Sequence, residues 1–131
     1  LDAPAGLGSG FLLATCAADR AVVVTTADAS SLRDAQHTVM ELERFGSGSL
    51  HLVVNRVRRK MLRSMHATID DAIDKAGLPL IGVVPEDDAL PLCLNQGTPL
   101  LLTGSQSPAA AAYRNIAKRL QGGKVPLLRI K

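Results

Sequence analysis

Short apolar runs alternate along this chain with stretches that have helical spacing. The runs occupy residues 21–26, 51–57 and 80–84. The first is β-branched and lacks polar alternation, which is typical of a strand buried on both faces of a parallel sheet. The pattern predicts an α/β fold in which a doubly wound, mostly parallel sheet is flanked by helices and connected by right-handed crossovers.

Two segments with helical spacing separate these runs. The first covers residues 30–44, and either Ser30 or Ser31 can serve as its N-cap. The second covers residues 68–76 and ends at Gly77. Connections of this length favour one strand–helix–strand unit after another.

The last helix has the clearest start in the chain. It follows a short helix expected over residues 88–95, and it begins with Ser107 as N-cap and Pro108 at the first helical position. Gly122 and Gly123 end it. The stripe expected to face the sheet consists of Tyr113, Ile116, Ala117 and Leu120.

Composition bounds the core and the class of partner. Apolar residues make up 47% of the 131 residues but aromatic residues only 2%, so the core must consist of Leu, Val, Ile and Ala. This length fits one domain, residues 1–131. A net charge of +3 is too mild to indicate nucleic-acid binding. Cys16 and Cys93 lack C-x-x-C spacing and are expected to be buried free thiols, as in a reducing cytosol.

Polar residues gather where the expected strands end. They lie in residues 2–6, 25–28, 55–56 and 85–87. Ligands of such sheets bind beyond the carboxyl ends of the strands, so these four segments form a candidate site. Each segment alone could also be an ordinary turn. Because no strand and no initiator Met precedes Leu1, we expect the chain to be the C-terminal part of a longer protein.

A series of motifs in fixed order carries a resemblance to a known family. The motifs are Asp2-Ala3-Pro4-Ala5-Gly6, Thr25-Thr26 with Ser31-Leu32-Arg33-Asp34-Ala35, Val54-Asn55-Arg56-Val57, Gly82-Val83-Val84-Pro85-Glu86-Asp87 and Ala112-Tyr113-Arg114-Asn115-Ile116-Ala117-Lys118-Arg119-Leu120. The series resembles the C-terminal half of the MinD family, the septum-site-determining ATPases of the deviant P-loop (ParA-like) class.

The resemblance implies the C-terminal portion of a P-loop NTPase fold. It implies a parent protein that binds ATP and magnesium, forms a nucleotide-dependent dimer with itself, and works with Min-system regulatory proteins. It also implies a cytoplasmic protein attached reversibly at the inner face of the cell membrane. Two alternatives stay open: a ParA-like DNA-segregation or cofactor-loading ATPase, and a non-catalytic α/β interaction module.

The same resemblance implies catalytic roles near the start of the chain. Asp2 would order magnesium through water, as suits a hard cation that keeps several waters. Gly6 would let the following loop approach the γ-phosphate. A plain turn glycine is the alternative for Gly6.

Cofactor-binding roles are implied at the other strand ends. Asn55 resembles the family's base-reading asparagine, whose amide both donates to and accepts from adenine, and Arg56 follows it. Residues Pro85, Glu86 and Asp87 resemble the segment that lines adenine and ribose, mostly through its backbone. Asn55 could instead satisfy a nearby loop, and the two carboxylates could simply start a short helix.

Arg33 and Asp34 resemble a family segment near the dimer surface where regulatory partners dock. An ordinary solvated helix face explains them as well. Asp28 stands where relatives often carry Pro-Glu, so no role is carried over to it. The basic stretch within residues 56–63 lacks interleaved aromatic residues and is expected to be a solvated loop.

Two absences shape the functional expectation. The phosphate-cradling G-x-x-x-x-G-K-[ST] loop occurs nowhere in the chain. Without its lysine and backbone amides the transition state of hydrolysis loses most of its stabilisation, so this chain alone should not hydrolyse ATP. The amphipathic membrane helix of the family is not evident either, because Pro126 interrupts the short tail 124–131.

Overall fold

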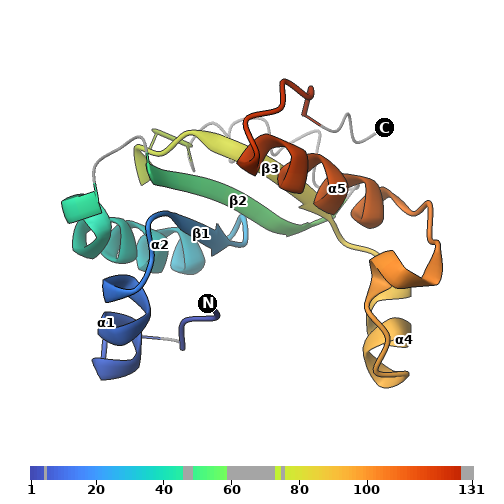
Figure 1. The fold of residues 1–131 in the computed structure, drawn as a ribbon, viewed down its shortest axis with the longest axis horizontal. Coiled ribbons are helices and arrows are strands. Elements are labelled where there is room, and N and C mark those ends of the chain that lie inside the picture. Colours follow the sequence, from blue (N-terminus) through green and yellow to red (C-terminus); the bar gives the residue numbers. More distant parts are fainter. Residues whose placement is uncertain (5, 46–48, 59–72, 75, 128–131) are drawn as a thin grey trace.

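The computed structural model describes residues 1–4, 6–45, 49–58, 73–74 and 76–127. Its centre is a three-stranded parallel sheet in the order β1 (Ala21–Thr25), β2 (Leu50–Val57) and β3 (Leu80–Pro85). The predicted runs therefore form the predicted kind of sheet. Figure 1 shows the sheet with helices on both of its faces, as a doubly wound fold requires.

Helix α2 (Ala29–Leu42) covers one face of the sheet. Its buried residues recur at helical spacing: Leu32, Ala35, Val39 and Leu42. They share one core cluster with Leu52 and Val54 of β2. Three residues that follow, Glu43–Phe45, form a 3₁₀ turn, η1. The helix thus lies within two residues of the predicted 30–44.

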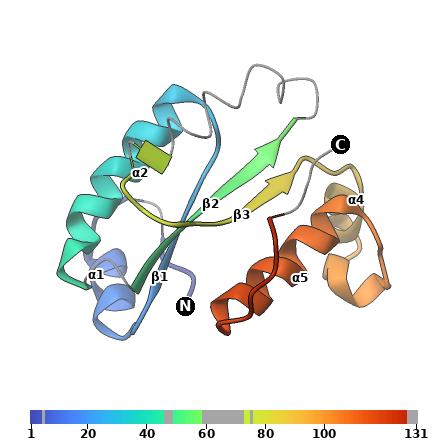
Figure 2. The ribbon, with the colours of Figure 1, turned by 90° about the horizontal axis from the view of Figure 1, so that it is seen from above.

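Helix α5 (Pro108–Leu120) covers the opposite face, over β3 (Figure 2). Its predicted N-cap is confirmed, because the Ser107 hydroxyl accepts a hydrogen bond from the amide of Ala110. The face that packs most closely is made of small residues: Ala109, Ala110 and Ala112 are buried. Small side chains let the helix approach the sheet closely.

The predicted inward stripe of α5 is partly wrong. Tyr113, Ile116 and Leu120 pack against the cluster of this face, but Ala117 is exposed. Gly82 shows how tight the contact is, because a Cβ there would lie 2.2 Å from Cγ1 of Ile116.

Three further elements lie outside the sheet and the two helices that cover it. They are α1 (Ser9–Cys16), α4 (Ala89–Asn95) and the 3₁₀ helix η4 (Leu100–Thr103). The expectation that both cysteines are buried is half wrong, because Cys16, at the end of α1, is exposed while Cys93 is buried. The error arises because α1 leaves one side open, with Leu13 73% exposed.

Most of the helix predicted over 68–76 lies outside the described residues. Residues 73, 74 and 76 are helical, and Gly77 follows with φ +63°, the left-handed conformation of a helix stop. None of the helices in the described part of the chain is long and apolar enough to cross a bilayer.

Candidate functional site

A broad hollow of about 1740 Å³ lies beside β1 and extends to the carboxyl ends of β1 and β2. It is lined by several of the predicted site residues. Asp2 and Gly6 line it from the N-terminal segment, Thr26 from the end of β1, and Asn55 from β2. Three separate segments therefore meet at one surface, as expected for a ligand site beyond the ends of parallel strands.

Asn55 sits in a break of the strand ladder. Val54 pairs with Val83 and Val57 with Pro85, so β2 advances three residues where β3 advances two. The Oδ1 atom of Asn55 accepts a hydrogen bond of 2.9 Å from the backbone amide of Arg56. This is the local contact foreseen as the alternative to base reading. It occupies one lone pair of Oδ1 and leaves the second lone pair and the Nδ2 donors for another partner.

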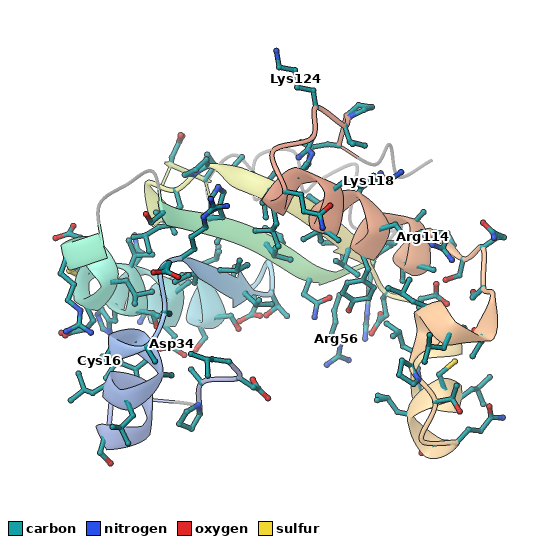
Figure 3. All side chains as sticks on the ribbon, viewed as in Figure 1. Cys16, Asp34, Arg56, Arg114, Lys118 and Lys124 are labelled. Atoms are coloured by element: carbon teal, nitrogen blue, oxygen red, sulfur yellow. The ribbon has the colours of Figure 1, made fainter. Side chains whose placement is uncertain are left out.

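Arg56 and Arg58 converge on one carboxylate across the two strands. Nη2 of Arg56 lies 3.2 Å from Oε1 of Glu86, and Nε of Arg58 lies 2.6 Å from Oε2. These contacts hold the pKa of Glu86 below its ordinary value, with Arg58 the larger cause and Arg56 the second. In Figure 3 Arg56 extends away from the sheet, on the side opposite α5.

The Asp87 carboxylate accepts hydrogen bonds from backbone amides of the fold. Its Oδ1 accepts from the amide of Ala89 at the start of α4, and its Oδ2 accepts from Ala109 in the first turn of α5. A hydrogen bond from the Ser107 side chain is the main reason that the pKa of Asp87 is lowered, and these two backbone amides add to it. The alternative role foreseen for this segment, starting a short helix, thus describes the Asp87 side chain.

Residues 85–87 do not line the hollow. They adjoin it through β2, because the amide of Glu86 donates to the carbonyl of Val57 over 3.0 Å. Pro85 is buried and Glu86 points at the arginines. A contact from this loop to a ligand would therefore come from its backbone, as the family resemblance implies.

The N-terminal segment contributes one carboxylate and one glycine to the lining of the hollow. Asp2 is exposed at the hollow, and Gly6 has φ +84°, a conformation that favours glycine. Within the described ranges no three His, Cys, Asp or Glu side chains could together hold a metal. A single carboxylate nevertheless suits Mg²⁺, which keeps several waters and takes phosphate oxygens as its other ligands.

Arg33 and Asp34 both lie exposed on α2. Asp34 also lines the hollow, whereas Arg33 does not. The structure therefore separates the two predicted partner residues, one toward the hollow and one away from it. Of the basic stretch, residues 59–63 lie outside the described part of the chain.

Sequence reasoning missed the polar cluster at the start of α2. Asp28, not Ser30 or Ser31, is the N-cap, and its Oδ1 accepts from the amide of Ser31 over 3.0 Å. Its Oδ2 accepts from the hydroxyls of Thr26 and Ser31. These contacts, led by Thr26, lower the pKa of Asp28 to about 2. The available signal was an Asp three residues before a Ser.

The curated proteins that this chain resembles are septum site-determining proteins. No family model matches the chain. The septum site-determining protein MinD of Synechocystis sp. is 36% identical over 129 residues, covering 98% of this chain and 48% of that protein. The MinD of Bacillus subtilis is 36% identical over 129 residues, covering 97% and 48%. The chain spans about half the length of the curated relatives it matches.

Solved structures agree. The MinD cell division protein of Aquifex aeolicus superposes with a TM-score of 0.86 at 32% identity, covering 97% of this chain and 54% of that one. A MinC:MinD complex from the same organism gives 0.85 at 32%, covering 96% and 52%. MinD of Pyrococcus horikoshii complexed with Mg-ADP gives 0.73 at 25%, covering 91% and 48%.

Proposed function

Because the chain belongs to the MinD family of septum site-determining proteins, whose C-terminal half it matches, we propose that it supplies part of a Mg-ATP site. The protein would use this site in placing the division septum. The convergence of Asp2, Gly6 and Asn55 on one hollow carries the proposal. Support for the ligand comes from the Pyrococcus horikoshii relative, whose structure is a complex with Mg-ADP.

Each residue has a distinct task in this proposal. Asn55 reads the adenine edge with Nδ2 and the free lone pair of Oδ1, and the backbone of residues 85–87 lines the base and ribose. Asp2 holds a water of the magnesium ion, and Gly6 gives its loop room to follow the γ-phosphate. Bound magnesium would neutralise phosphate charge.

The partners belong to the same proposal. The protein forms a nucleotide-dependent dimer, attaches reversibly to the membrane, and docks Min-system regulators near Arg33 and Asp34. One structural neighbour is a MinC:MinD complex, which supports a regulator of this kind. Both Arg33 and Asp34 are exposed and available for such contacts. In the described part of the basic stretch, Arg56 and Arg58 are both paired with Glu86.

A titration followed by ¹H–¹⁵N NMR tests the proposal. Mg-ATP added to the 131-residue chain should shift the amides of residues 55–58 and 85–87 more strongly than Mg-GTP does. Asn55→Ala should abolish the difference between the two nucleotides, while Asn95→Ala, an exposed amide at the end of α4, should keep it. The chain should release no phosphate, because it carries no P-loop. Equal shifts with both nucleotides, or shifts confined to other residues, would refute the base-reading role.

A further inference from the structure

A backbone hydrogen bond and two ion pairs of Glu86 connect the ends of β2 and β3 close to Asn55 in the chain. The Glu86 amide donates to the carbonyl of Val57, and the Glu86 carboxylate takes one guanidinium on each oxygen. Both guanidinium groups come from β2 or the residue after it, on either side of Val57. Glu86, the residue after β3, thus contacts three consecutive residues: Arg56, Val57 and Arg58.

The contacts of Glu86 involve a residue with an unusual backbone conformation. Arg56 has φ +55°, and it is the only non-glycine residue with positive φ among those the structure describes. Such a conformation is unfavourable for a residue with a Cβ and persists only where the surroundings impose it. The extra residue of the bulge also returns Val57 to the same core cluster as Val54, although the two are three positions apart in the strand. Packing of Val57 and the ion pairs of Arg56 and Arg58 together impose the turn.

A hydrogen bond orients the Asn55 side chain beside this turn. The left-handed conformation of Arg56 accompanies the hydrogen bond from its amide to Oδ1 of Asn55, which sets the direction of the side-chain amide. Asn55 is half-buried and lines the hollow with Asp2. An amide held this way presents donor and acceptor in one fixed order, which is what discrimination between an adenine edge and a guanine edge needs.

We propose that Glu86 is a positioning residue for base recognition: through Arg56 and Arg58 it holds the β2 bulge in the shape that orients Asn55. The proposal rests on the proposed nucleotide site. It gives Arg56 and Glu86, for which the family resemblance implied contact with the cofactor, a role exerted through Asn55. Each carboxylate oxygen of Glu86 forms an ion pair with one guanidinium group. These groups can therefore act on base recognition without touching the base.

The experiment compares Glu86→Gln and Glu86→Ala with Glu41→Gln, a control that neutralises an exposed carboxylate of α2. Glutamine has a single acceptor oxygen and no charge, so Glu86→Gln keeps at most one of the two arginines and should preserve the fold. The first readout needs no ligand. In the free chain, hydrogen exchange at the Arg56 amide should accelerate and the Asn55 side-chain amide resonances should move toward solvent-exposed values, in the order wild type, Gln, Ala.

The second readout is base discrimination, the ratio of dissociation constants for Mg-GTP and Mg-ATP from the NMR titration. We expect Glu86→Ala to lower this ratio roughly fivefold, about the free energy of one hydrogen bond. Glu86→Gln should lower it less, and Glu41→Gln should leave it at the wild-type value. A role limited to stability would lower affinity for both nucleotides alike and leave the ratio unchanged.

The outcomes separate the two proposals. If the wild-type chain binds and discriminates but the Glu86 variants discriminate equally well, the positioning role is wrong and the nucleotide site stands. If the wild-type chain binds neither nucleotide at residues 55–58, the nucleotide site is wrong, and base positioning by Glu86 falls with it. If exchange at Arg56 is the same in Glu86→Gln and Glu86→Ala as in wild type, Glu86 does not hold the bulge at all.

Discussion

At the scale of single residues, Asp28 shows how one carboxylate organises a strand end. It caps α2 by accepting a hydrogen bond from the Ser31 amide, and it also accepts from the hydroxyls of Thr26 and Ser31. Every one of these contacts favours the ionised form, and together they lower the pKa of Asp28 from 3.8 to about 2.

That lowered pKa predicts a pH dependence. A carboxyl group whose pKa is lower in the folded than in the unfolded state stabilises the fold fully above the unfolded pKa. Its contribution is lost as the pH falls from about 4 to about 2. Asp28→Asn keeps a capping oxygen without the charge. The difference between the free energies of unfolding of wild type and Asp28→Asn, measured with urea, should therefore be constant above pH 4 and shrink toward pH 2. A difference that does not change with pH would contradict this account.

At the scale of elements, Ser107 and Asp87 join the end of β3 to the start of α5. The Ser107 hydroxyl accepts from the Ala110 amide, while the Asp87 carboxylate accepts from the Ala109 amide. Two of the otherwise unpaired amides in the first turn of α5 are thereby satisfied. Because Asp87 lies only two residues after β3, the cap also fixes where the helix begins relative to the sheet.

We expect Ser107→Ala to lower the free energy of unfolding by about 1 kcal/mol, since the cap accepts a backbone hydrogen bond that alanine cannot replace. Ser107→Gly is the matched control, because glycine at an N-cap costs only a few tenths of a kcal/mol. Chemical denaturation monitored by circular dichroism measures both. An unchanged free energy of unfolding in Ser107→Ala would show that the Ser107 hydroxyl does not stabilise the helix.

The elements also show what could be foreseen from the sequence. The strands and α5 were predictable because their signals are local: β-branched runs, and a Ser-Pro start followed by alanines. The Asn55 bulge was not, since Arg56 adopts positive φ without being glycine and does so under contacts from Glu86, thirty residues later. Exposure of Cys16 likewise depends on which side of α1 the fold leaves open. The topology predicted that Asp2 and Asn55 lie at one edge of the sheet, and both line the same hollow, whereas the partners of the Glu86 side chain could not be predicted.

At the scale of the whole molecule, the two faces of the sheet are covered unequally. Val24 pairs in register with Val53, so both point to the α5 face, yet α5 lies over β3 and away from β1 (Figure 2). Val24 is consequently 60% exposed and Val22 is 37% exposed. Among the described strands β1 pairs only with β2, so its other edge carries free backbone donors and acceptors beside these valines.

An apolar strip next to an open strand edge predicts self-association of the 131-residue chain. Its average mass in sedimentation velocity should rise with concentration, and Val24→Lys should suppress that rise, because a lysine on an edge strand opposes pairing with another chain. Stability should change by no more than about 0.5 kcal/mol, since Val24 is largely solvated. Met40→Lys places the same charge on an exposed position of α2 and should associate like wild type. Equal suppression by both variants would attribute the effect to net charge and remove the β1 edge as its cause.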